Sequence, residues 1–348
     1  MRFLYANARN VYPHDRHLID GLRENGHTVV ELEENGPGPS KYLRLFKRLR
    51  QDKTSYDAVF AGFPSPIFAI VARLARKEKV IFNATSSQYE ANIVSRGVFP
   101  FSPAALKWWL IDLLSFHMSS QVLLESDAQR AYIHKLFFVP KRKLVRAWSG
   151  LNEKDFFYEP GIGKLSRFTV LFRGRFLGES GIETVIKAAK SLEQSGVSFL
   201  VIGHGFLHRE VGRLMAELHP ANLEMITTSL PIAELRRKMQ ECHISLGQMA
   251  DHPRLDRTLP MKLFESLAMR LPYLTGRNKG ALELLKEDET CLCSKPGDAE
   301  DLAEKILFLK GRPEILERVA SNGYELYRHS LTSKILAQEV VEACFPHP

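Results

Sequence analysis

Short apolar runs alternate with segments of helical periodicity along the whole chain of 348 residues. Apolar runs flanked by turn-forming residues predict buried strands, and apolar positions spaced three or four residues apart predict the helices between them. This alternation is typical of strand-helix-strand units, which assemble into parallel sheets with helices on both faces. We therefore expect an α/β protein with doubly wound parallel sheets.

The strand pattern occurs in two successive series. The first comprises residues 2–6, 28–32, 58–63, 79–82, 121–124 and 144–147, and the second comprises residues 168–172, 198–202, 223–226, 244–246, 272–275 and 290–293. Turn-forming residues cluster between the series, and the chain is too long for one ordinary core. We expect two Rossmann-like domains facing each other across a cleft, at 1–158 and 159–330, with a C-terminal helix at 331–348 that crosses back to the first domain.

Composition narrows the class of protein. With 45% hydrophobic and 25% charged residues, the chain has the balance of a soluble globular protein, and no apolar stretch is long enough to predict a membrane span. No export signal is visible at the N-terminus, and the four cysteines lack the spacing of a zinc site or a disulfide framework. We expect a cytoplasmic protein with reduced, packed thiols.

The formal charge of +8 favours an anionic partner. The most concentrated basic stretch, residues 41–53, places apolar side chains at helical spacing among lysines and arginines. Such a helix either packs its apolar stripe on the sheet or lies on an anionic membrane at the inner face, and the pattern is the same for both. A nucleic-acid partner is not expected, because the chain lacks an aromatic-basic platform or finger spacing.

A second apolar stretch, residues 99–118, contains Phe99, Phe101, Trp108 and Trp109. Core packing is one interpretation of it. The other is an exposed surface for a lipid-linked acceptor or a partner protein, since contiguous exposed apolar patches mark binding sites.

Candidate binding chemistry lies in the second half of the chain. Arg173, Gly174 and Arg175 end a buried strand, where open parallel sheets bind ligands, and glycine with arginine suits the approach of a diphosphate. Pro260 favours a helix start, so Met261 and Lys262 would offer backbone N–H groups and a cation to an anion there.

Together with Gly203 and Gly205 after the next strand, these residues resemble the retaining GT-B glycosyltransferases of the large family four, the glycosyl transferases group 1. The resemblance rests on Gly174-Arg175, the Gly-x-Gly, the Lys262 to Ala268 segment and the following Leu-Pro, and on a linker similar to residues 149–160. It implies a metal-independent, retaining hexosyltransferase that needs no cofactor beyond a nucleotide-diphosphate sugar such as a UDP-sugar. A saccharide or lipid-linked molecule would be the acceptor.

The resemblance also implies residue roles. Arg175 would contact the donor diphosphate, and Glu265 would hold the ribose hydroxyls. Lys262, at the expected helix start, is the second candidate catalytic residue. The remaining expected donor-binding residues are Arg173, Gly174, Gly203, Gly205, Thr258, Leu259 and Met261. The chain differs from the family pattern at Ser180, where a lysine is usual, and at Arg257, where the first of two acids is usual; Arg173 or Lys262, and Asp256, are the candidate replacements.

The first domain would supply the acceptor side from three segments that follow strands, at residues 7–10, 63–65 and 83–89. His14 and His17 are possible substitutes for a catalytic-loop histidine, although histidines near a helix start are more often surface residues. The leading hypothesis is sugar transfer in the synthesis of cell-surface polysaccharide or glycolipid. The alternative is a noncatalytic GT-B protein that binds a nucleotide or a partner without turnover.

Overall fold

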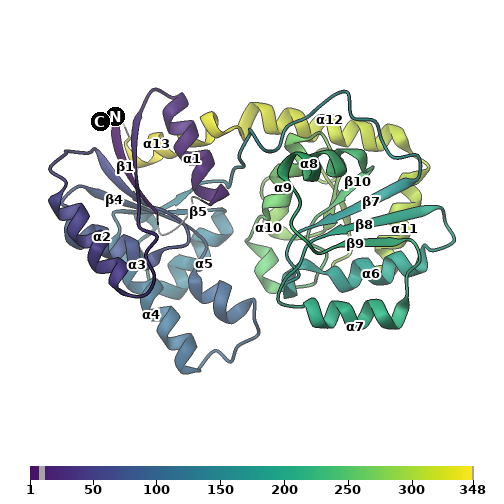
Figure 1. Cartoon of the computed structure of the whole chain (residues 1–348), viewed down its shortest axis with the longest axis horizontal. Coiled ribbons are helices and arrows are strands. Elements are labelled where there is room, and N and C mark those ends of the chain that lie inside the picture. The colour runs from purple at the N-terminus through teal and green to yellow at the C-terminus, as the bar shows by residue number, and fades with distance from the viewer. Residues whose placement is uncertain (8–11, 347–348) are drawn as a thin grey trace. The chain divides into compact units, whose positions relative to one another are not determined.

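The computed structural model describes residues 1–7 and 12–346 and divides the chain into two compact units. The first unit combines Met1–Asn152 with Ser330–Pro348, and the second is the continuous segment Glu153–His329. Within the described residues, no helix is long and apolar enough to cross a membrane. Each unit contains a six-stranded sheet (Figure 1).

The sheet of the first unit is entirely parallel, with the strand order β2-β1-β3-β4-β5-β6. Its strands are β1 (Arg2–Asn7), β2 (Thr28–Glu33), β3 (Ala58–Ala61), β4 (Lys79–Thr85), β5 (Gln121–Leu124) and β6 (Leu144–Arg146). Side chains alternate between its faces: Phe3 and Tyr5 enter one apolar core, and Leu4 and Ala6 enter the other. Because both faces are covered, the strands are continuous apolar runs.

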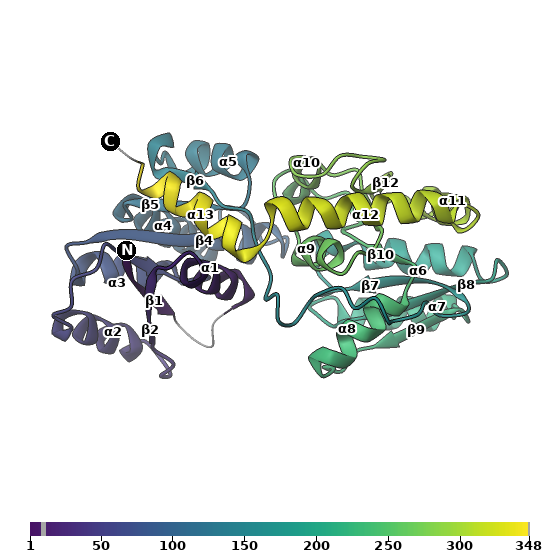
Figure 2. The same ribbon diagram turned by 90° about the horizontal axis from the view of Figure 1, so that it is seen from above.

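Helices cover the two faces of this sheet. On one face lie α1 (Pro13–Glu24) and α13 (Ser333–Cys344), which pack against each other (Figure 2). On the other face lie α2 (Ser40–Gln51), α3 (Pro66–Ala75), α4 (Pro103–Met118) and α5 (Asp127–Phe137). The C-terminal segment therefore completes the core of the first unit.

The second unit repeats this architecture with the strand order β12-β11-β10-β7-β8-β9, again all parallel. Its strands are β7 (Phe168–Arg173), β8 (Val197–Ile202), β9 (Leu223–Ile226), β10 (Ile244–Leu246), β11 (Tyr273–Gly276) and β12 (Leu292–Ser294). Its helices are α6 (Ile182–Ser191), α7 (His208–Leu218), α8 (Ile232–Glu241), α9 (Met261–Ala268), α10 (Lys279–Leu282), α11 (Ala299–Lys310) and α12 (Pro313–Ser330). The predicted fold class of two Rossmann-like parallel sheets is confirmed.

The strand order reverses direction once in each sheet. In the second unit the chain runs from β7 outward through β8 and β9, then returns to the opposite side of β7 as β10. In the first unit the reversal lies between β1 and β3. Adjacent loops diverge from the sheet at such a switch point and leave a crevice at the carboxyl ends of the strands. The fold therefore offers one natural ligand position in each unit.

Candidate functional site: a cationic pocket at the switch point of the second unit

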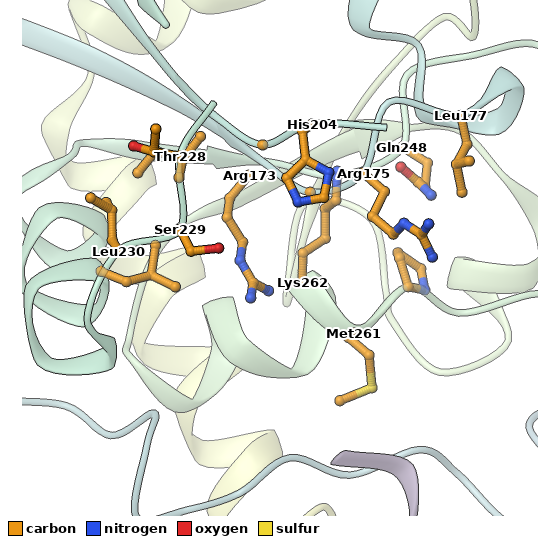
Figure 3. Close-up of a pocket in the computed structure, with 15 residues that line it drawn as sticks. Arg173, Arg175, Leu177, His204, Thr228, Ser229, Leu230, Gln248, Met261 and Lys262 are labelled. Carbon is orange, nitrogen blue, oxygen red and sulfur yellow. The ribbon is translucent and has the colours of Figure 1, made fainter. Parts of the chain in front are cut away.

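A pocket of about 380 Å³ lies at this switch point, built from the loops that follow β7, β8, β9 and β10 and from the start of α9. Its walls are Arg173, Gly174, Arg175, Leu177, Ile202, Gly203, His204, Thr228, Ser229, Leu230, Leu235, Gln248, Pro260, Met261 and Lys262. Figure 3 shows the side chains of Arg173, Arg175 and Lys262 within it, with Thr228, Ser229 and Leu230 on one side and Leu177 and Gln248 on the other. Three cationic side chains thus line one crevice.

Glycines allow the strand ends to approach each other. Gly174 has a φ of 148°, in a region that side chains disfavour, and a Cβ on it would lie 3.1 Å from Cε of Lys262. A Cβ on Gly203 would lie 1.8 Å from the carbonyl oxygen of Gly174. These two positions require glycine because the β7 and β8 loops and the Lys262 side chain share the same space.

Lys262 is a buried cation at the floor of the pocket. Its Nζ lies 3.9 Å from the centre of the Phe172 ring and donates a hydrogen bond of 3.3 Å to the carbonyl oxygen of Gly247. Burial lowers the pKa of Lys262 to about 7, with a further lowering from the charge of Arg173. An anion bound in the pocket would stabilise the protonated form of this side chain.

Arg173 and Glu265 form an ion pair at the edge of the pocket. The Arg173 Nη1 donates to Oε2 of Glu265, whose side chain is 4% exposed, and the guanidinium lies 5.4 Å from the centre of the Phe156 ring. Arg173 is half-buried and held in one place. Arg175 differs: its side chain is exposed and makes no ion pair among the described residues. The charge of Arg175 is therefore available to a ligand.

The start of α9 opens at the pocket, through Pro260, Met261 and Lys262. Helix N-termini carry free N–H groups and a partial positive charge. The preceding Thr258 and Leu259 are buried behind this wall, and Oγ1 of Thr258 donates to the carbonyl oxygen of Arg254. The helix start adds to the positive potential of the three side chains.

The predicted donor-site residues divide into two groups. Six line the pocket: Arg173, Gly174, Arg175, Gly203, Met261 and Lys262. Four do not: Gly205, Thr258, Leu259 and Glu265. Gly205 packs against the backbone of Phe176, and Glu265 acts on the pocket through Arg173. The roles of all ten remain predictions.

Sequence reasoning missed the pocket residues Leu177, His204, Thr228, Ser229, Leu230 and Gln248. Oε1 of Gln248 is buried without a hydrogen-bond partner, so this acceptor is free for a ligand. The signal that could have found Thr228 and Gln248 is their position just after β9 and β10, since the carboxyl ends of parallel strands share one edge.

The positions that differ from the family pattern have structural partners. Ser180 is buried, and its Oγ donates to the carbonyl oxygen of Leu177 over 2.7 Å. Arg257 donates to the carbonyl oxygen of Pro253, and Asp256 lies 3.9 Å from Nζ of Lys279. Ser180, Asp256 and Arg257 are all absent from the pocket wall, whereas Arg173 and Lys262 belong to it.

The switch point of the first unit contains a buried carboxylate that sequence reasoning missed. Oδ1 of Asp15 accepts hydrogen bonds from the Tyr5 hydroxyl (2.7 Å), the Asn83 amide (2.8 Å) and the Phe63 backbone N–H (3.1 Å). Asp15 Oδ2 and both amide atoms of Asn7 are buried without a partner. The Asp15 side chain thus connects β1, β4 and the loop after β3. The segments predicted for the acceptor side lie at the ends of these three strands. Residues 8–10 of the first segment lie outside the described residues.

His17 is buried, so the surface interpretation is wrong for this residue, whereas His14 is half-buried. Burial lowers the pKa of each to about 4, and both imidazoles are therefore neutral at pH 7. The ring of His14 packs on Phe63 with centres 4.7 Å apart, and the ring of His17 occupies the space that a side chain at Gly150 would need. Helix α1 places both histidines inward because it packs against α13.

We expect Asp15→Asn to alter the pH dependence of stability. Burial raises the pKa of Asp15 to about 6, above the usual 3.8. The stabilisation from protonation is therefore present at low pH and lost as pH rises through about 6, a difference of roughly 3 kcal/mol. The free energy of unfolding of the variant relative to the wild type should rise between about pH 4 and pH 7, as measured by urea denaturation. A constant difference between the two proteins would contradict the assignment.

The comparison with protein families matches the second half of the chain. Residues 159–326 match the family of glycosyl transferases group 1. The matched segment covers most of the second unit, Glu153–His329. The cationic and glycine positions of the pocket all fall within the matched residues, and so does the whole pocket: Arg173, Gly174, Arg175, Gly203 and Lys262.

The individual curated relatives of the chain are distant. The α-D-kanosaminyltransferase of Streptomyces kanamyceticus is 26% identical over 45% of the chain and 40% of its own length. The amylovoran biosynthesis glycosyltransferase AmsK of Erwinia amylovora is 24% identical over 52% of the chain and 46% of its own length. The matches thus span less than half the length of these relatives.

The fold extends over the whole chain. The crystal structure of HepE from Anabaena in complex with UDP and glucose superposes with a TM-score of 0.74, covers 98% of both chains and is 15% identical. At that identity the likeness shows the fold alone. Within the described residues, no group of three or more histidines, cysteines or acidic residues is arranged to hold a metal ion.

Proposed function

We propose that the protein transfers a sugar from a nucleotide-diphosphate donor to an acceptor hydroxyl with retention of anomeric configuration. The observation that carries this proposal is the pocket at the β7/β10 switch point, in which Arg173, Arg175, Lys262 and the start of α9 present positive charge to one crevice. The matching family and the UDP complex of the structural neighbour HepE support a donor of this class.

The diphosphate of the donor would lie between Arg175 and Lys262, over the β7 loop. Arginine offers a planar fork of N–H donors, and Gly174 with Gly203 allows the phosphate oxygens to approach the backbone. The apolar wall of Ile202, Leu230 and Leu235 suits the planar base. Glu265 would hold the ribose hydroxyls from its place beside Arg173.

Bond cleavage develops negative charge on the leaving diphosphate oxygen. Fixed cations and a helix N-terminus stabilise that charge more in the transition state than in the bound donor, so they accelerate the reaction. The proposed reaction therefore uses Arg175 and Lys262 in place of a divalent metal. The switch point of the first unit, with Asp15 and the unpartnered amide of Asn7, is the proposed position for the acceptor hydroxyl.

Binding of a nucleoside diphosphate is expected to be coupled to proton uptake by Lys262. The pKa of this side chain is about 7 in the empty pocket, and a nearby diphosphate should raise it. The affinity for UDP should therefore fall as pH rises from about 7 to about 9. Calorimetry in two buffers of different ionisation enthalpy measures the protons taken up, and Lys262→Met should abolish that uptake. Equal uptake by the variant would exclude Lys262 as the titrating group.

The proposed product class is based on the functions of the relatives. AmsK acts in amylovoran biosynthesis, and we propose a saccharide or lipid-linked acceptor for this chain in the synthesis of a cell-surface polysaccharide or glycolipid. We also propose that the protein works in the cytoplasm, where α2 is available to the inner face of the membrane. Within α2, Arg44 and Arg48 pair with Glu34, which leaves Lys47 and Arg50 for anionic lipid.

The decisive experiment mixes purified protein with a panel of sugar nucleotides and measures the nucleoside diphosphate released. Thermal shift identifies the donors that bind, and product NMR determines the anomeric configuration. Release from at least one bound donor, with retention, supports the proposal. Binding without release for every donor and acceptor tried would instead favour the noncatalytic alternative, in which Ser180 and Arg257 mark lost function.

A further inference from the structure

The outer face of α4 and the segment before it form an exposed apolar ridge in the first unit. The ridge consists of Phe99, Phe101, Leu106, Leu110 and Leu114. Phe101 is 86% exposed and Phe99 is 67% exposed. Their rings pack edge to face, with ring centres 5.6 Å apart. The three leucines are spaced four residues apart, so they form one row along the solvent side of the helix. Large side chains gathered in this way mark a binding surface.

The ridge residues take no part in the packing of α4 against the core of the first unit. The opposite side of the helix fills the core through Ala105 and Phe116, and Asp112 is buried where it accepts a hydrogen bond from the backbone N–H of Tyr89. The helix is therefore apolar on both its inner and its outer side, a pattern that packing on the sheet does not require. Figure 1 shows α4 beside α3 and α2 on one side of the first sheet, an arrangement that their mutual contacts confirm.

The exposed charges on α4, on the segment before it and beside its C-terminal end are positive. Between residues 89 and 118, all of which the structure describes, both acids are buried, whereas Arg96 and Lys107 are exposed. At the far end of α4, Lys143 donates to the carbonyl oxygens of His117 and Ser119, and it is adjacent to the exposed Lys141 and Arg142. Cations thus border the apolar row near both of its ends.

We propose that this ridge inserts its side chains into the interfacial layer of an anionic lipid bilayer. An apolar row bordered by lysine and arginine matches acyl chains beneath negatively charged headgroups. With 16 residues, α4 is too short to span the bilayer, so it would lie along the surface. This inference is independent of the proposed reaction, and it differs from the electrostatic contact proposed for α2 because the attraction is mainly apolar.

Flotation with vesicles tests the proposal with the full chain. We expect the wild type to float with phosphatidylcholine vesicles that contain phosphatidylglycerol, and less with phosphatidylcholine alone. The double variant Phe101→Ser/Leu110→Ser should lower the partition coefficient about tenfold or more, because it removes two exposed apolar side chains from the contact. The matched control Leu307→Ser/Phe308→Ser changes the same residue types at exposed positions of α11 and should float as the wild type does.

Tryptophan fluorescence gives a second readout, because two of the three tryptophans, Trp108 and Trp109, lie in α4. Brominated lipids should quench the wild type and the control but not the ridge variant. If the ridge variant melts below the wild type, Leu106→Gln/Leu114→Gln replaces it in both experiments. UDP binding should be unchanged in all of them, which separates this test from that of the reaction.

Several results would overturn the proposal. One is flotation of the ridge variants equal to that of the wild type, and another is no flotation of the wild type at all. Complete release by high salt would leave only the electrostatic contact of α2. Self-association of the wild type that the ridge variants lose, without any effect of vesicles, would identify the ridge as an interface between copies of the chain.

Discussion

Arg175→Ala should reduce kcat/KM for sugar transfer by about 30-fold to 1000-fold, which corresponds to roughly 2 to 4 kcal/mol of transition-state stabilisation. The side chain lines the pocket, is exposed and has no ion-pair partner among the described residues, so its charge is free to act on a bound diphosphate. For the same reason its removal should leave the melting temperature unchanged.

The matched control is Arg213→Ala. Arg213 lies on α7 of the same unit, its side chain is 79% exposed, and it forms a surface ion pair with Glu210. This variant loses the same charge from the protein but not from the pocket, so its kcat/KM should equal that of the wild type. If both variants lost activity equally, a general effect of net charge would explain the result, and the diphosphate role of Arg175 would be wrong.

Glu265→Gln should weaken nucleotide binding and also lower the stability of the second unit by on the order of 2 kcal/mol. The variant leaves Arg173 without its counter-charge, and breaking a buried ion pair costs about 3 to 5 kcal/mol. We expect less because the Arg173 side chain is 26% exposed, so water compensates part of the lost interaction. Urea denaturation and UDP titration measure the two effects.

A double variant separates the two roles of this pair. Arg173→Met/Glu265→Leu removes both charges, so no buried charge remains unpaired and much of the lost stability should return. Nucleotide affinity should not return, because the double variant lacks both the Glu265 carboxylate proposed for the ribose and the Arg173 cation of the pocket wall. Glu287→Gln, which breaks the more exposed pair with Arg277, serves as the control and should cost less than about 1 kcal/mol. Recovery of both properties in the double variant would assign Glu265 a purely structural role.

Local pattern was sufficient to predict the architecture. All twelve predicted strand segments correspond to observed strands, because strands buried on both faces are apolar runs between turn-forming residues. The ends of the strands differ from the prediction by up to three residues. Strand β4 continues to Thr85, three residues beyond the predicted end, although Asn83 and Thr85 are polar. Both side chains lie near the carboxyl end of the strand, where the Asn83 amide donates a hydrogen bond to Asp15. The periodicity of the sequence does not predict such a contact.

The candidate site could be predicted only where a residue follows a strand directly or starts a helix. Arg173, Gly174 and Met261 meet that condition, and they line the pocket. The partner of Glu265 could not be predicted, since Arg173 precedes it by 92 residues and only the folded sheet brings the two side chains together. Asp15 was missed for a related reason: its three hydrogen bonds come from three different strands or their loops, and no local spacing encodes them.

The place of α13 in the first unit has a consequence for synthesis on the ribosome. A Cβ on Gly21 of α1 would lie 1.9 Å from the carbonyl oxygen of Ser333, so the first and last helices fit closely together. The second unit is one continuous segment and is able to fold as soon as it has emerged from the exit tunnel. The first unit begins earlier, but its core lacks Ala337 and Val340 until α13 has been made. The order of completion is therefore the reverse of the order of translation.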